Sequence, residues 1–207
     1  MDVKIKICGI KNLEDALFCV KEGVDALGFI FYPKSKRFIK PIEARNIVKK
    51  LPCFMNKVGV FIDSPKEKVL RIADFVGLDT LQFHGSESPG YCREFRKRFK
   101  VIKTFFSNTQ GLTSLISKYQ VDGILLDIPL ENKEIFPQAS LDSAIIRTLV
   151  GKFNYLILSG GLTVENVGYF VRRFKPYGVD VARGVEKYPG KKDKSLIKKF
   201  IGEIKNV

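Results

Sequence analysis

The chain has 207 residues, of which 45% are hydrophobic and 12% aromatic, a composition that excludes a disordered or low-complexity protein. Its formal net charge is +14, from 36 Lys and Arg against 22 Asp and Glu. No apolar run approaches the roughly 20 residues that a membrane-spanning helix needs.

One pattern repeats along the chain: a short apolar strand, a polar or glycine-rich turn, and an amphipathic helix. Helix starts are predicted near Asn12, at Pro41 and at Ser64-Pro65, and a last helix covers residues 194–205. The predicted strands cover residues 3–8, 26–31, 58–62, 80–83, 101–105, 123–127, 155–158 and 179–181.

Strands this apolar, alternating with helices, indicate a parallel sheet covered by helices. Eight units follow one another without a linker or a shift in composition. We therefore predict an α/β fold, a single-domain (β/α)8 TIM barrel over residues 1–207. An open doubly wound sheet is the runner-up, but no GxGxxG motif follows the first strand.

Cysteine spacing and charge narrow the class of protein further. Cys8, Cys19, Cys53 and Cys92 lie far apart and form no CxxC pair, so we expect neither a disulfide framework nor structural zinc. The N-terminus lacks the apolar centre of a signal peptide, which predicts a soluble cytoplasmic protein without a membrane partner. The basic residues are spread over nearly every predicted helix and accompany no nucleic-acid motif. A solvated surface that attracts small anions is therefore favoured over nucleic-acid binding.

In such a barrel the active site is built at the C-terminal ends of the strands. The side chains predicted at this rim, besides those of the last two loops, are Cys8, Arg37, Asp63, His84 and Asp127. His84 is the only histidine and is as easily a structural residue as a ligand contact. Arg37 follows three other polar residues of a basic loop. It is either solvated or a clamp for a carboxylate on the substrate.

The loops after the seventh and eighth strands have the features of a phosphate site. Gly160 and Gly161 allow the backbone to approach a ligand and offer its N–H groups. Ala182, Arg183 and Gly184 add further N–H donors and a guanidinium. These barrels commonly hold a phosphate between these two loops, so we expect one here rather than two simple turns.

Cys8 and Asp127 end the first and sixth strands, on nearly opposite sides of the barrel. A thiol of ordinary pKa, about 8.5, needs nearby positive charge to act as a base at neutral pH. Lys6, which faces the same way along the strand, and Arg37 are possible sources of that charge. A carboxyl group opposite could serve as general acid.

Together these motifs resemble the phosphoribosylanthranilate isomerase family of tryptophan biosynthesis. The resemblance runs almost from end to end and in order. Its segments are 6–10 (KICGI), 12–16 (NLEDA), 28–37 (GFIFYPKSKR), 58–61 (VGVF), 81–85 (LQFHG), 126–127 (LD), 159–162 (SGGL), 165–167 (ENV), 178–181 (GVDV), 184–186 (GVE) and 189–193 (PGKKD).

The resemblance implies an Amadori rearrangement of N-(5'-phosphoribosyl)anthranilate, with no cofactor and no metal. Asp127 would protonate the furanose ring oxygen and open the ring to an iminium, and Cys8 would remove the proton from C2'. Arg37 would hold the anthranilate part, and the loops after strands seven and eight would hold the phosphate. Asp180 would help to fix the ligand or the loop. The implied partner is a small phosphorylated substrate, bound by a monomer or a homodimer.

Two departures from the family pattern stand out. Members usually carry a Gly-Gly-Thr-Gly-type loop after the strand-six aspartate, whereas residues 128–140 contain no glycine here. Small hydroxyl residues commonly follow the strand-eight Val-Asp-Val, and here Ala182 and Arg183 replace them. Backbone N–H groups survive that second change.

Two other readings remain open. One is a divergent barrel acting on another sugar phosphate, with Lys103 on the fifth strand as part of a catalytic Lys/Glu pair. The other is a non-catalytic, basic, nucleic-acid-binding barrel, which the charge and the altered sixth loop favour.

Overall fold

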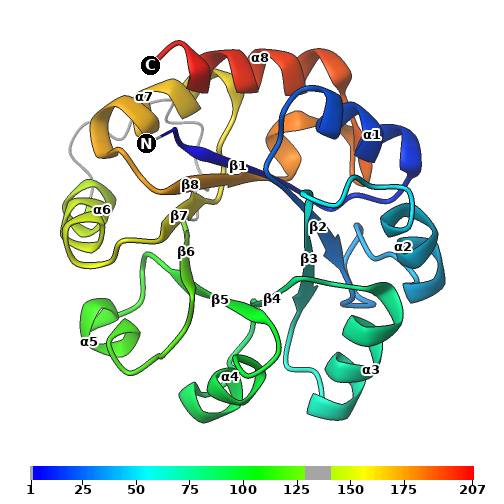
Figure 1. Cartoon of the computed structure of the whole chain (residues 1–207). Helices are drawn as coiled ribbons and strands as arrows, with labels where there is room; N and C mark the ends of the chain where they lie inside the picture. Colours follow the sequence, from blue (N-terminus) through cyan, green and yellow to red (C-terminus); the bar gives the residue numbers. More distant parts are fainter. Residues whose placement is uncertain (1, 129–140) are drawn as a thin grey trace.

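The computed structural model describes residues 2–128 and 141–207. Within these residues, eight parallel strands form a closed barrel in the order of the chain, from β1 to β8. Figure 1 looks down this barrel, with the strands in the central ring and the helices outside it. The predicted TIM barrel is confirmed, and the open sheet is excluded because β1 pairs with β8.

The strands begin and end within two residues of their predicted positions. They are β1 (Lys4–Cys8), β2 (Ala26–Ile30), β3 (Asn56–Phe61), β4 (Thr80–Phe83), β5 (Lys100–Phe106), β6 (Gly123–Asp127), β7 (Leu156–Ser159) and β8 (Gly178–Val181). The helices are α1 (Leu13–Lys21), α2 (Pro41–Val48), α3 (Lys66–Val76), α4 (Pro89–Phe95), α5 (Leu112–Ile116), α6 (Leu141–Lys152), α7 (Val164–Phe174) and α8 (Lys194–Lys205).

Local chemistry explains the helix starts. The Asn12 side chain accepts a hydrogen bond from the Asp15 N–H at 2.8 Å, so it caps α1 as predicted. Pro41 is the first residue of α2, where its missing N–H costs nothing. Pro65 is the residue before α3, so this helix begins directly after the predicted Ser64-Pro65 pair.

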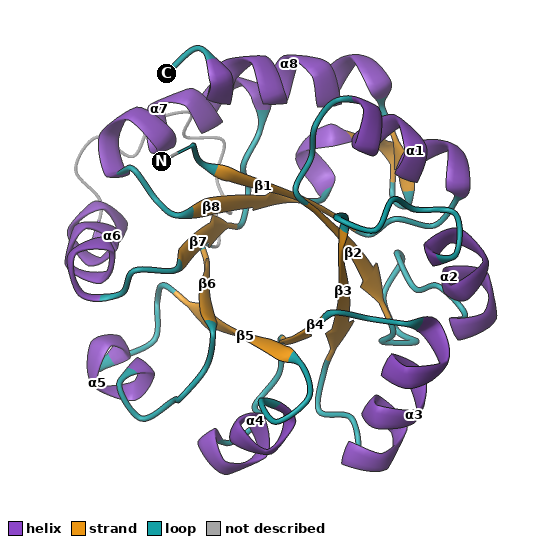
Figure 2. Cartoon of the chain, in the orientation of Figure 1, coloured by secondary structure: helices purple, strands orange, loops and turns teal. Residues whose placement is uncertain are grey.

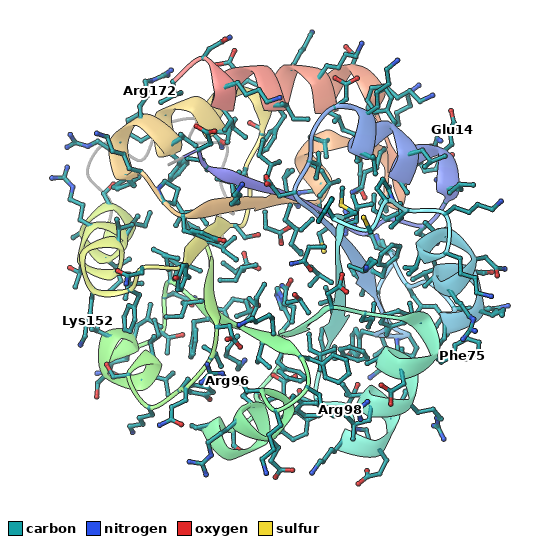
Figure 3. All side chains as sticks on the ribbon, viewed as in Figure 1. Glu14, Phe75, Arg96, Arg98, Lys152 and Arg172 are labelled. Atoms are coloured by element: carbon teal, nitrogen blue, oxygen red, sulfur yellow. The ribbon has the colours of Figure 1, made fainter. Side chains whose placement is uncertain are left out.

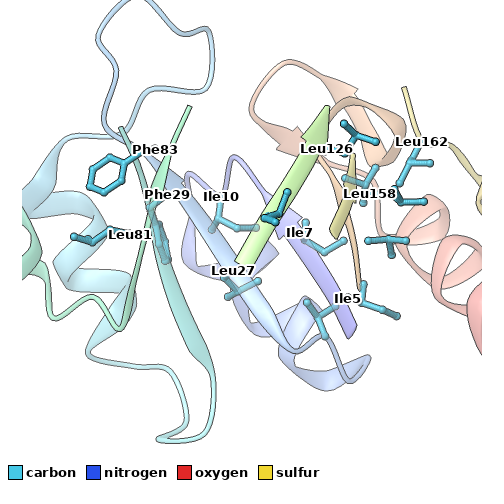
Figure 4. Close-up of a cluster of buried hydrophobic side chains, with 14 of the residues drawn as sticks. Ile5, Ile7, Ile10, Leu27, Phe29, Leu81, Phe83, Leu126, Leu158 and Leu162 are labelled. Carbon is cyan, nitrogen blue, oxygen red and sulfur yellow. The ribbon is translucent and has the colours of Figure 1, made fainter. Parts of the chain in front are cut away.

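Successive side chains of each strand point to opposite faces of the sheet. Those on the outer face, such as Ile7, Phe29 and Leu126, are fully buried in the apolar layer between barrel and helices (Figure 4). The inner face carries polar groups at the same depth, among them Lys6 and Gln82. The outer face therefore supplies the core, and the inner face is left for chemistry.

A feature absent from the predicted pattern follows β8. A short 3-10 turn (Arg183–Val185) leads into an antiparallel hairpin of β9 (Glu186–Tyr188) and β10 (Lys191–Lys192). Figure 2 shows this hairpin beside α1, outside the barrel. Lys191 joins it to that helix, because its Nζ lies 2.8 Å from Asp15 Oδ1.

The basic residues surround the molecule. The labelled side chains of Arg96, Lys152 and Arg172 lie in separate parts of the molecule, outside the ring of strands (Figure 3). This agrees with the predicted distribution of charge over many helices. None of the helices within the described residues is long and apolar enough to cross a membrane.

Candidate active site

The C-terminal ends of the strands surround an open cleft of about 1180 Å³. Apart from Asp63, every site residue proposed from the sequence lines this cleft, although these residues come from several different strands and loops of the barrel (Figure 1). They are Cys8, Arg37, His84, Asp127, Gly160, Gly161, Asp180, Ala182, Arg183 and Gly184.

Cys8 is the last residue of β1, and it pairs in register with Gly28 of β2. A Cβ atom at position 28 would lie 2.7 Å from Cys8 Sγ and 3.1 Å from Lys6 Nζ. A larger residue than glycine would therefore displace the thiol, the ammonium group or both. Gly28 provides the space in which these two groups lie side by side.

The charges around the Cys8 thiol act in opposite directions. Lys6 Nζ donates to Asp180 Oδ1 at 2.9 Å, and the two side chains are only 5% and 6% exposed. Burial raises the pKa of the thiol, whereas Lys6 and Lys192 lower it, and the net result is a raised pKa. Lys6 is thus a source of positive charge as predicted. The second cation acting on the thiol is Lys192, whose place near Cys8 no pattern in the sequence predicted.

Arg37 is held by a buried carboxylate rather than lying among solvated cations. Its Nε lies 2.9 Å from Glu186 Oε1, and its Nη2 lies 2.6 Å from Glu186 Oε2. The Arg37 side chain is 20% exposed and reaches the cleft, whereas that of Glu186 is 2% exposed. Within residues 2–128 and 141–207, Arg37 Nη1 has no hydrogen-bond partner and is available to a ligand carboxylate.

Asp127 ends β6 and is in contact with the only histidine of the chain. His84 Nε2 lies 3.3 Å from Asp127 Oδ2, and His84 Nδ1 lies 3.2 Å from Thr104 Oγ1. Gln82 Nε2 is 3.3 Å from the same ring nitrogen. A neutral imidazole can donate to an ionised carboxylate or accept from a protonated one. With the Gln82 amide donating to Nδ1, a neutral His84 carries its ring proton on Nε2 and donates it to the Asp127 carboxylate.

The two glycine-bearing loops leave no room for a side chain at Gly160 and at Gly184. Gly160 has a φ of +83°, and a Cβ there would lie 2.1 Å from the Ile128 carbonyl oxygen. A Cβ on Gly184 would lie 2.0 Å from the Leu162 carbonyl oxygen. The loop after β7 is thus packed backbone to backbone against Ile128 after β6 and against Gly184 after β8, at the edge of the cleft. These glycines therefore leave backbone rather than side chains at this edge of the cleft, as an anion site made of N–H groups needs.

Two other polar candidates lie away from the cleft. Lys103 Nζ donates to the carbonyl oxygens of Phe83, Gly85 and Thr104 and pairs with Glu87 at 3.2 Å, so its protons are used for structure. Asp63 Oδ1 accepts a hydrogen bond from the Ser86 N–H at 2.7 Å. Neither lines the cleft, which removes the basis for a catalytic Lys103.

The structure does not test two predictions, the effect of the glycine-free stretch 128–140 and the absence of a metal or cofactor. Apart from Ile128, the glycine-free stretch 128–140 lies outside the described residues. Among the residues that are described, no group of three or more His, Cys, Asp or Glu side chains could hold a metal ion. The absence of a metal and a cofactor stays a prediction.

Comparisons with known proteins agree on one family. The model of the family described as N-(5'phosphoribosyl)anthranilate (PRA) isomerase matches residues 5–203. The chain is 44% identical to N-(5'-phosphoribosyl)anthranilate isomerase of Thermotoga maritima, across 99% of this chain and 100% of that protein.

Solved structures give the same result. A phosphoribosyl anthranilate isomerase in complex with reduced 1-(o-carboxyphenylamino)-1-deoxyribulose 5-phosphate has a TM-score of 0.89 and 43% identity, covering 99% of this chain and 100% of that one. A structure of monomers derived from the dimeric Thermotoga maritima enzyme has a TM-score of 0.84 and 41% identity, with the same coverage.

Proposed function

Because the chain belongs to the N-(5'-phosphoribosyl)anthranilate isomerase family, we propose that it performs this family's reaction with Cys8 as general base and Asp127 as general acid. The reaction converts N-(5'-phosphoribosyl)anthranilate to 1-(2-carboxyphenylamino)-1-deoxyribulose 5-phosphate in tryptophan biosynthesis. The observation that carries the residue assignment is that both groups line one cleft, together with a cation and two glycine loops.

The chemistry needs one proton donor and one proton acceptor. Asp127 gives its proton to the furanose ring oxygen as the bond from that oxygen to C1' breaks, which leaves an iminium between C1' and nitrogen. The iminium withdraws electrons, so the C2' proton becomes acidic enough for the Cys8 thiolate to remove. The electron pair left at C2' forms the C1'–C2' double bond and neutralises the nitrogen. The resulting enolamine tautomerises to the ketone.

The rest of the cleft binds and orients the substrate in this proposal. Arg37 holds the anthranilate carboxylate, and its Nη1 is the atom open to that carboxylate. The N–H groups of the loops after β7 and β8 bind the phosphate. Asp180 keeps Lys6 beside the thiol. His84 contacts Asp127 and lines the cleft, so it touches both the acid and the substrate.

A direct assay tests the activity. The purified chain is mixed with freshly made N-(5'-phosphoribosyl)anthranilate, and loss of the substrate's fluorescence is followed. We expect turnover well above the rate with heat-denatured protein, and a product with the substrate's mass and a ketone carbon in its NMR spectrum. Substrate loss with release of free anthranilate, rather than an isomer, would contradict the proposal.

The phosphate site is tested at Gly184. In Gly184→Ala the new methyl group would meet the Leu162 carbonyl oxygen at 2.0 Å and push the two loops apart. Losing well-aligned N–H donors to a charged group costs about 1.5–3 kcal/mol, or roughly a ten- to hundredfold weaker phosphate contact. We expect KM and the inhibition constant of inorganic phosphate to rise by that order, with a smaller change in kcat.

Gly202→Ala is the matched control, because nothing lies within 4 Å of a Cβ at that position in α8. It should leave both constants unchanged and slightly stabilise the helix. An unchanged phosphate inhibition constant in Gly184→Ala would remove Gly184 from the phosphate site.

The proposed function includes an oligomeric state. We infer a homodimer, as described for the Thermotoga maritima enzyme. Sedimentation at micromolar concentration should then give about twice the chain mass of 23.5 kDa, and a single-chain mass would contradict it.

A cytoplasmic location and the lack of a nucleic-acid partner stay predictions, which cell fractionation and a salt-dependent binding assay would test.

A further inference from the structure

Two fully buried, oppositely charged side chains lie next to the cleft without a role in the chemistry described above. Glu186 opens β9 and Lys192 ends β10, so both belong to the hairpin that follows β8. Their side chains are 2% and 0% exposed, and Lys192 Nζ lies 3.0 Å from Glu186 Oε1. The free energy needed to desolvate two buried charges can exceed the free energy gained from their attraction. Protein stability alone is therefore a weak explanation for this buried pair.

The hydrogen bonds of Lys192 lead directly to the site. Its Nζ donates to the Cys8 carbonyl oxygen at 2.6 Å and to the Ala182 carbonyl oxygen at 3.1 Å. With Glu186 as third partner, all three protons of the ammonium group are used. One buried cation thus joins the end of β1, where the proposed base lies, to the loop that begins the proposed phosphate site.

Glu186 connects the hairpin to Arg37, the residue proposed to hold the anthranilate carboxylate of the substrate. Its carboxylate accepts hydrogen bonds from Nε and Nη2 of Arg37. Its Oε1 also accepts a hydrogen bond from the Gly190 N–H at 3.1 Å. A carboxylate that accepts two hydrogen bonds along one edge of a guanidinium, here from Nε and Nη2, fixes the plane of that group as well as its position. The remaining Nη1 edge of Arg37 is therefore aimed by Glu186, across 149 residues of sequence.

We propose that Glu186 and Lys192 are positioning residues: Glu186 aims Arg37 at the ring carboxylate of the substrate, and Lys192 fixes the Cys8 backbone against the phosphate loop. The hairpin thereby fixes the distances between Arg37, which binds the carboxylate, the loop that binds the phosphate, and Cys8, the base. Holding the substrate and the base in the correct relative positions supplies a large part of an enzyme's rate enhancement. This inference rests on the proposed function, because it takes Arg37, Cys8 and the phosphate loop in the roles given above.

The role of Glu186 is tested by a ligand pair. Glu186→Gln keeps the shape of the side chain and removes its charge. Its binding of a reduced product analogue is compared with its binding of the same compound lacking the ring carboxylate. We expect about tenfold weaker binding of the carboxylated compound and little change for the other, because only the first uses Arg37. A merely structural role would weaken both compounds equally or neither, and either result would overturn the proposal.

The role of Lys192 is tested by a pH profile. Lys192 lowers the pKa of the Cys8 thiol, so in Lys192→Met we expect kcat/KM to reach its alkaline plateau at higher pH. We also expect kcat to fall about tenfold or more from the misplaced base. A profile that keeps its midpoint with kcat unchanged would overturn this part. Should Lys192→Met fail to fold, Lys192→Gln, which removes the charge but keeps an N–H donor for the Cys8 carbonyl oxygen, should show the same shift of the pH midpoint, and an unshifted midpoint there would overturn this part.

The neighbouring residue of the hairpin supplies the matched control. Lys191 pairs with Asp15 on α1 and does not line the cleft. Lys191→Met should lower the unfolding temperature without changing ligand discrimination or the pH midpoint. A wild-type chain without turnover would contradict the proposed function. Normal turnover with wild-type behaviour in both hairpin variants would contradict only this inference.

Discussion

Cys8→Ser is expected to lower kcat by about 100- to 10,000-fold, the range that a general base contributes. A serine hydroxyl fits the space beside Gly28 but stays protonated at neutral pH, so it cannot take the C2' proton. KM should change little, because Arg37 and the phosphate loops remain in place. Steady-state fluorescence kinetics on the purified variant measure both constants.

The pH dependence of the wild type follows from the same thiol. Burial raises the pKa of Cys8 above its ordinary value despite the two nearby ammonium groups. The base is active only when ionised, so kcat/KM should rise with pH through neutrality and level off on the alkaline side. In Cys8→Ser this rising limb should disappear from the same pH range. A limb that persists in the variant would assign it to another group.

Two other cysteines provide controls for Cys8→Ser. Cys19 is fully buried in α1, away from the cleft, so Cys19→Ala should cost stability but not turnover. Cys53 is exposed, so Cys53→Ser should change neither. Substantial activity in a well-folded Cys8→Ser enzyme would exclude Cys8 as the base.

The sequence carried enough information to place the proposed acid and base at one rim. β4 and β6 lie where the apolar runs predicted them, and strand alternation correctly set Lys6 and Cys8 on the same face. These features depend on short-range periodicity, which a sequence displays directly. Once eight units close into a barrel, the strand ends meet, and Asp127 lines the same cleft as Cys8.

The partners of those residues were not predictable in the same way. Glu186 lies in a polar run, Glu-Lys-Tyr, that is typical of a solvated segment, yet its carboxylate is buried against Arg37. Lys192 follows another lysine, and only one of the two points inward. A hairpin of three and two residues leaves no periodic pattern, and the contacts depend on chain closure over more than 140 residues. The pairing of His84 with Asp127 likewise needs β5 to lie between their strands.

Asp127→Asn is expected to lower kcat by about 100- to 10,000-fold as well, for a different reason. An amide has the shape of the carboxyl group and can keep the contact with His84, but it has no proton of suitable acidity to give to the ring oxygen. Ring opening should then limit the rate. Asp63→Asn is the matched control, because Asp63 follows the end of β3 by two residues but does not line the cleft. This variant should retain wild-type turnover.

Substrate deuterated at C2' separates the two proposed roles, because the acid and the base act in successive steps. When Cys8→Ser slows removal of the C2' proton, that step should control the rate, and the isotope effect on kcat should exceed the wild-type value. When Asp127→Asn slows ring opening, the C2' bond breaks after the slow step, and the isotope effect should fall toward one. The opposite pattern would exchange the roles of the two residues. Equal isotope effects in both variants would mean that a single step uses both groups, which the two-step mechanism does not allow.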